Sequence, residues 1–88
     1  MSNIISIDPG NKKCGLLLVD IQSRNIIDAR ISRLEDFSDL ISYWYKNYLI
    51  DKIIIGDGTN CNFLVKKLKE KEINNVFFVD ESGSTMRA

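Results

Sequence analysis

The chain has 88 residues, of which 44% are hydrophobic and 27% charged, and its twelve basic side chains balance twelve acidic ones. This length allows one domain, which buries about 60 to 65% of the surface of its unfolded chain. Zero net charge excludes a global attraction to polyanions, so any nucleic-acid site must depend on local charge. There is no histidine, which excludes the usual nucleophilic triads and the commonest general base.

Targeting and redox signals point to the cytoplasm. No early stretch has the pattern of a signal peptide, and no apolar run approaches the length of a membrane span, so we expect no membrane partner. Cys14 and Cys61 cannot form a standard zinc site without histidine, and their spacing does not suggest a disulfide framework. We therefore expect both thiols to be reduced, with Cys14 in a strand.

The first element is an apolar run over residues 4–7, which predicts a buried strand and ends in Asp8. Pro9 ends the strand and Gly10 allows a sharp turn, so Asp8 is held on rigid backbone with Lys12 and Lys13 nearby. That arrangement suits a metal-binding acid that faces a phosphate. The plainer interpretation is a turn acid between two hairpin strands, because Asp-Pro-Gly is a common turn sequence.

Two further strands follow and complete a meander. The apolar run over residues 16–19 predicts the second. In the third, apolar side chains alternate with polar ones, as expected of a half-exposed antiparallel strand at the edge of a sheet. The alternating residues are Ile27, Asp28, Ala29, Arg30 and Ile31.

The period then changes to that of a helix. Apolar residues recur at spacings of three and four: Leu34, Phe37, Leu40, Ile41, Trp44, Tyr45 and Tyr48. We expect Ser32 or Ser38 to cap this helix. Its aromatic residues would allow base stacking, but a stripe at this spacing is more typical of a helix face that packs on a sheet.

A second strand–helix pair and a last strand follow. The β-branched residues 53–55 predict a parallel strand covered on both faces. Thr59 or Asn60 would cap the next helix, whose Phe63, Leu64 and Leu68 we place inward and whose lysines we place on a solvated face. Residues 74–75 would end it. Residues 76–79 predict the last strand, after which residues 82–88 resemble a loop and a first helical turn.

This order of elements predicts a mixed α/β sheet with strand order 3-2-1-4-5. The tips of the first, fourth and fifth strands would then share one edge and carry Asp8, Asp57 and Glu81. Neighbouring strands lie about 4.8 Å apart, so Asp8 and Asp57 could bridge one ion toward which Glu81 leans. Oxygen ligands of this kind suit Mg²⁺ or Mn²⁺.

These acids have structural alternatives. Asp57, in Gly-Asp-Gly, is equally well explained as a turn or capping residue. Only one of Asp80 and Glu81 can face the crevice, and we choose Glu81. Thr59 either presents its hydroxyl to a phosphate or simply caps the helix.

Three segments resemble the YqgF group of RNase H-like proteins, relatives of the RuvC Holliday-junction resolvases. They are Ile-Asp-Pro-Gly-Asn-Lys-Lys-Cys-Gly at 7–15, Ile-Gly-Asp-Gly-Thr-Asn at 55–60 and Val-Asp-Glu-Ser-Gly-Ser-Thr at 79–85. The resemblance covers nearly the whole chain and implies an RNase H-like fold. It also implies a metal-dependent phosphodiesterase whose first acid is Asp8 and second is Glu81. Asp57 follows from the strand geometry, supported by the more distant resolvases.

The chain departs from the pattern of this family. Ser82 replaces the arginine that follows the Asp-Glu pair, and Arg87 stands where an acid is usual. Family members also carry a third acid on a later helix, which this sequence does not reach. We therefore expect residues 1–88 to be one RNase H-like domain, incomplete at its C-terminus and not fully active alone.

The expected activity is metal-dependent cleavage of RNA, as in processing of the small-subunit ribosomal RNA precursor, or of branched DNA. Lys12 and Lys13, with Thr59, would hold the phosphates of the substrate. One alternative is a binding module for nucleic acid or protein that does not cut. Another is a fragment of an actin-like ATPase or sugar kinase, which opens with a similar strand, acid and turn. We also expect self-association through the exposed sheet edge.

Overall fold

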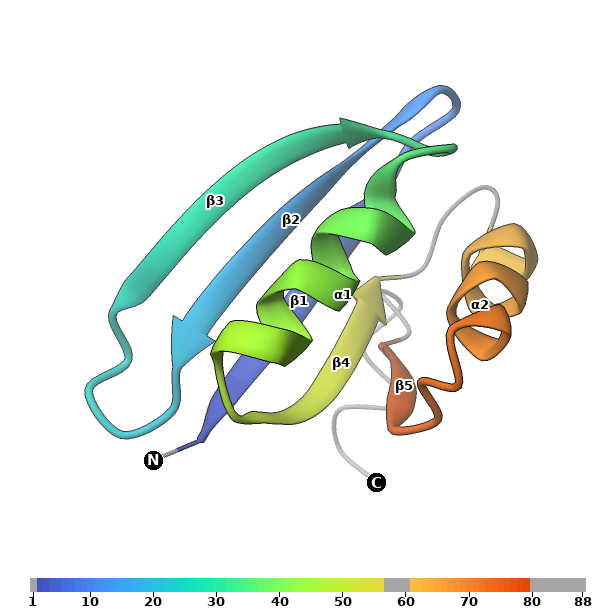
Figure 1. Ribbon diagram of the computed structural model, residues 1–88. Coiled ribbons are helices and arrows are strands. Elements are labelled where there is room, and N and C mark those ends of the chain that lie inside the picture. Colours follow the sequence, from blue (N-terminus) through green and yellow to red (C-terminus); the bar gives the residue numbers. More distant parts are fainter. Residues whose placement is uncertain (1, 57–60, 80–88) are drawn as a thin grey trace.

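The computed structural model describes residues 2–56 and 61–79, which form a five-stranded sheet and two helices (Figure 1). No helix in these ranges has the length and apolar character needed to cross a membrane. The elements, in chain order, are β1 (Asn3–Pro9), β2 (Lys13–Asp20), β3 (Ile26–Arg33), α1 (Phe37–Asn47), β4 (Ile50–Gly56), α2 (Cys61–Glu70) and β5 (Val76–Val79).

The strand order β3-β2-β1-β4-β5 confirms the predicted topology. β1 pairs antiparallel with β2 and parallel with β4, and β4 pairs parallel with β5. Both helices contribute to one core, so both lie on the same face of the sheet. This face we call the helix face, and the opposite one, to which no described helix contributes, the open face. The C-terminal ends of β1, β4 and β5 lie at the same end of the sheet.

The core lies between the helices and the sheet. The stripe predicted for the first helix is confirmed, because Phe37, Ile41 and Trp44 of α1 are fully buried. They pack with alternate residues of the strands, among them Ile5 and Ile7. Burying each such side chain contributes roughly 1.5–3 kcal/mol. The apolar periodicity therefore determines which face of β1 receives the helices.

Cys14 belongs to this core and confirms the prediction of a strand residue. Cys14 and Cys61 are not joined by a disulfide. Burial raises the pKa of the Cys14 thiol to about 11. A thiol that remains protonated at neutral pH is a poor nucleophile, so Cys14 has a packing role.

The predicted cap of the first helix is wrong. The residue at the N-cap position of α1 is Asp36, which makes no side-chain capping bond, and Ser38 lies inside the helix. The Ser32 hydroxyl instead donates to the carbonyl of Arg33 within β3. α1 is held mainly by its buried face, and Asp39 in the first turn and Lys46 in the last complement its dipole.

The third strand lies at the sheet edge as predicted, with its apolar side chains on the open face. Arg30 pairs with Leu16, a core residue, and therefore shares the helix face. It forms an ion pair of 3.1 Å with Asp28. Ile31 pairs with Gly15 and is 79% exposed. The helices do not cover β3. The alternation of apolar and polar residues along β3 therefore does not indicate which of its faces packs on a core.

The second helix differs from its prediction at Phe63 and at its end. Leu64 and Leu68 are buried as expected, but Phe63 is 39% exposed. Phe63 precedes Leu64, so it lies about 100° around the helix from the buried stripe. α2 ends at Glu70, and Glu72 adopts a left-handed conformation with φ of 61°. The predicted caps Thr59 and Asn60 lie outside the described residues.

Asn75 attaches the short strand β5 to the rest of the fold. Its side-chain oxygen accepts from the Tyr45 hydroxyl at 2.6 Å, and its amide nitrogen donates to the Asp51 carbonyl at 2.7 Å. Its backbone carbonyl accepts from Ile53 N at 2.9 Å. Burial raises the pKa of Tyr45, and the Asn75 hydrogen bond opposes this shift. One residue thereby joins α1, β4 and β5.

Candidate functional site

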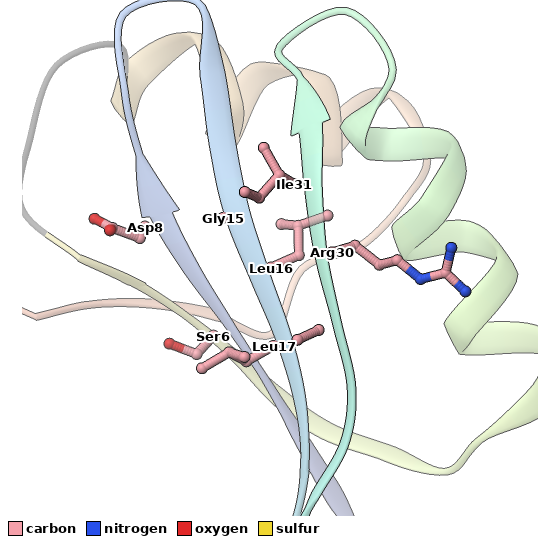
Figure 2. Close-up of a pocket in the computed structure, with 8 residues that line it drawn as sticks. Ser6, Asp8, Gly15, Leu16, Leu17, Arg30 and Ile31 are labelled. Carbon is pink, nitrogen blue, oxygen red and sulfur yellow. The ribbon is translucent and has the colours of Figure 1, made fainter.

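Asp8 is an exposed carboxylate near the C-terminal end of β1. It pairs with Gly15 of β2, where a side chain is missing, and a Cβ built at Gly15 would lie 3.8 Å from the Asp8 Cβ. Figure 2 shows Asp8 and Ser6 projecting from β1 away from α1, whereas Arg30 projects toward it. The carboxylate therefore belongs to the open face and has free space beside it.

A hollow of about 590 Å³ adjoins Asp8 on this face (Figure 2). Its lining is largely apolar, and Asp8 and the hydroxyl of Ser6 provide polar groups at one side. The lining residues are Ser6, Asp8, Gly15, Leu16, Leu17, Ala29, Arg30 and Ile31. An apolar concave surface with a few polar groups is the usual composition of a ligand site.

The turn after β1 is tightly built. A Cβ at Gly10 would lie 2.5 Å from the carbonyl oxygen of Lys13, so this position requires glycine. The carbonyl of Lys12 accepts from Leu34 N at 3.2 Å, which attaches the turn to the connection between β3 and α1. The hairpin tip that carries the two predicted phosphate-binding lysines is therefore fixed to neighbouring backbone.

Lys12 and Lys13 line a second hollow, of about 480 Å³, to which Asp8 does not contribute. The structure thus places the two lysines at the same end of the sheet as Asp8, but around a different hollow. The other lining residues are Arg33, Leu34, Glu35 and Phe63. We call this hollow, defined by its six lining residues, the cationic pocket.

Our sequence analysis did not identify Arg33 or Phe63 as site residues. The signal for Arg33 lies in the β2–β3 hairpin, because the strand register pairs Lys13 with Arg33. A count of residues back from the hairpin turn misses this pairing by one residue, because the ladder is irregular between Leu18 and Val19. No comparable signal exists for Phe63, because an aromatic residue next to a helix stripe is normally assigned to the core.

The other predicted site residues, Asp57, Glu81 and Thr59, lie outside the described residues, as do Asp80, Ser82 and Arg87. Within residues 2–56 and 61–79, no three acidic or cysteine side chains gather as a metal site would require. The strands that precede the two acids are in place, since Ile7 pairs with Ile55 and Gly56 pairs with Val79.

Comparisons with known proteins yield fold matches but no family. No protein-family model and no curated protein matches the chain. Among solved structures it is similar to Pelota from Archaeoglobus fulgidus, with a TM-score of 0.60, 15% identity and coverage of 89% of this chain and 26% of Pelota. It is also similar to a Ppx/GppA phosphatase from Aquifex aeolicus, with a TM-score of 0.54, 14% identity and coverage of 91% and 36%.

These matches show similarity of fold and do not assign a function. The chain spans about a quarter to a third of the length of the two matched proteins. Neither of them is a YqgF- or RuvC-type protein, so the YqgF resemblance and the RNase H-like assignment stay predictions. What the structure shows is a mixed α/β sheet with the order β3-β2-β1-β4-β5.

Proposed function

We propose that this domain contributes to metal-dependent hydrolysis of phosphodiester bonds in nucleic acid, either RNA or branched DNA. The observation that carries the proposal is the position of Asp8. It is an exposed carboxylate near the C-terminal end of β1, at the end of the sheet where β4 and β5 also terminate. Ligands of open α/β sheets bind at the carboxyl ends of the strands.

The proposed site combines Asp8 with the acids that follow the neighbouring strands, Asp57 and Glu81. Asp8 fits a hard cation such as Mg²⁺ or Mn²⁺, because it offers exposed carboxylate oxygens beside the hydroxyl of Ser6. When bound, such an ion activates water and stabilises the leaving oxygen. Lys12 and Lys13, with Thr59, would hold the phosphates of the bound strand.

Divalent-metal dependence is the direct test. We expect purified protein that contains these residues to cleave single-stranded RNA or a four-way DNA junction with Mg²⁺ or Mn²⁺, and not with EDTA. The measurement is product formation on denaturing gels across a metal titration. Cleavage that persists in EDTA contradicts the metal mechanism. Metal-independent binding without cleavage favours the alternative of a binding module.

The similarity to the Ppx/GppA phosphatase fold favours a second candidate, a phosphatase activity at the same end of the sheet. Since the identity is 14%, the fold is shared but the substrate is not implied. Inorganic polyphosphate and ATP in the same metal titration separate the two candidates. Release of phosphate from either one, without cleavage of nucleic acid, selects the phosphatase.

We also propose self-association through the edge strand β3. This strand is eight residues long, and Ile26, Ile27 and Ile31 are exposed on it. An edge with these features pairs readily with a second copy. We expect light scattering to show a dimer that Ile31→Lys shifts toward monomer, whereas Tyr43→Lys, at an exposed residue of α1, does not. A monomer at all concentrations contradicts the proposal.

A further inference from the structure

We infer that the cationic pocket binds an unpaired segment of nucleic acid, with a base stacked on Phe63 and the adjoining phosphates held by Lys12, Lys13 and Arg33. The inference takes its ligand class, nucleic acid, from the proposed function. It adds that the bound strand is single and that it lies in the cationic pocket. The pocket and Asp8 are separate hollows at one end of the sheet, so binding and cleavage can be measured independently.

The first argument is local charge in a chain whose net charge is zero. Three basic residues and one acidic residue, Glu35, line the pocket. In the described part of the chain, ion pairs join Arg30 to Asp28 and Lys71 to Asp39, and they include none of the pocket residues. The charges of Lys12, Lys13 and Arg33 are therefore not neutralised by a described partner, which is the condition for binding phosphates.

The positions of these cations are set by backbone geometry. The β2–β3 register holds Lys13 opposite Arg33, and the bond from Leu34 N to the Lys12 carbonyl ties the turn to the start of the next connection. Lys13 and Arg33 therefore lie opposite each other although they are about twenty residues apart in sequence. Because the backbone is already ordered, a ligand need only restrain the side chains when it binds.

The second argument is the aromatic ring. Phe63 is 39% exposed although its neighbour Leu64 is fully buried, and it contributes an apolar surface among the basic residues. The Lys67 ammonium lies 5.7 Å from the centroid of this ring, so the ring also has a cation as a neighbour on its own helix. Exposed aromatic rings beside backbone-tracking cations are the standard combination in proteins that bind single strands.

The two arguments together select an unpaired strand. A cluster of cations alone would serve any polyanion, including a duplex or polyphosphate. A ring can stack only on a base whose face is free, and bases inside a duplex are stacked on each other. The volume of about 480 Å³ lies in the range of pockets that take a small ligand, which suits one nucleotide of the strand.

The experiment measures fluorescence anisotropy of labelled eight-nucleotide RNA in EDTA, so that no metal-dependent cleavage occurs. The probes are the normal strand, an abasic strand with the same phosphates, and a blunt duplex. The pocket variants are Phe63→Leu, Lys12→Gln and Arg33→Gln. Matched controls are Tyr43→Leu and Lys46→Gln, which make comparable changes at exposed positions of α1. Circular dichroism checks that each variant is folded.

We expect Phe63→Leu to weaken binding of the normal strand about fivefold or more and to leave the abasic strand unaffected, because only stacking is lost. Lys12→Gln and Arg33→Gln should weaken both strands, and each should lower the slope of log affinity against log salt by about 0.7. The two control variants should change affinity less than about twofold.

Two outcomes overturn the inference. One is equal affinity for the abasic strand or the duplex, because the ring would then have no role. The other is a control variant that weakens binding as much as a pocket variant does. Failure of the nuclease proposal is a different result, in which the wild-type protein binds the strand in EDTA but does not cut it when Mg²⁺ or Mn²⁺ is added.

Discussion

Asp8→Asn should lower metal-dependent cleavage by about a thousandfold or more, because several kcal/mol of transition-state stabilisation depend on a bound ion. The amide keeps the size of the side chain but removes the charge that binds the cation. Asp8 is exposed and pairs through its backbone with Gly15, so the fold should be unaffected. Initial cleavage rates at saturating Mg²⁺, with circular dichroism of both proteins, measure the effect.

Asp51→Asn is the matched control for this substitution. Asp51 is also an exposed aspartate in a strand, but it lies near the beginning of β4, at the opposite end of the sheet. Cleavage by the Asp51 variant should equal that of wild type. If the Asp8 variant also retains wild-type activity, the carboxylate is a turn residue and the metal site must be sought elsewhere.

Trp44→Ala should reduce the free energy of unfolding by about 3–5 kcal/mol. Trp44 is fully buried and is among the largest buried side chains of the core, so its removal leaves a cavity between α1 and the sheet. A domain of this size has a total stability of roughly 4–13 kcal/mol, so the loss removes a large fraction of it and, at the lower end of this range, unfolds much of the protein. Urea titration followed by circular dichroism measures the change.

The neighbouring residue supplies the control for Trp44. Tyr43 belongs to the same helix but is 58% exposed, so Tyr43→Ala should change stability by about 0.5 kcal/mol or less. Comparable losses for the two substitutions would mean that the stripe of α1 does not define the core. Trp44→Phe should lie between the two, because most of the buried volume is kept.

The sequence patterns were sufficient for the topology, because the elements of the core repeat with clear periods. Ile5 and Ile7 alternate with residues of the open face, and Phe37, Ile41 and Trp44 follow a helical period. These two periods determine which surfaces must meet. The order of elements then leaves few ways to connect the strands with right-handed crossovers.

Features at the margins of the core were harder to predict. The N-cap position of α1 is occupied by Asp36 without a side-chain bond, since the buried face already holds the helix. Phe63 lies beside the buried stripe of α2. It is partly exposed although the next residue, Leu64, is fully buried. Periodicity identifies faces, but it does not show where a helix stops covering the sheet.

The candidate site was predictable in part. Asp8 could be placed from an apolar run that ends in an acid, and the structure puts it near a strand end as expected. The basic cluster needed the register of β2 with β3, because Arg33 meets Lys13 only through that pairing. Register depends on turn geometry and on an irregularity in the ladder between Leu18 and Val19, which composition does not reveal.

Asn75 has a consequence for how the last strand is aligned. Phe77 and Phe78 are consecutive and about equally exposed, so a slip of one residue would exchange one ring for the other at little hydrophobic cost. Apolar patterning therefore cannot choose between the two alignments. The amide of Asn75 can, because only one alignment brings it to both Tyr45 and Asp51. Uniqueness at this edge of the sheet thus comes from a polar side chain, while stability comes from the core.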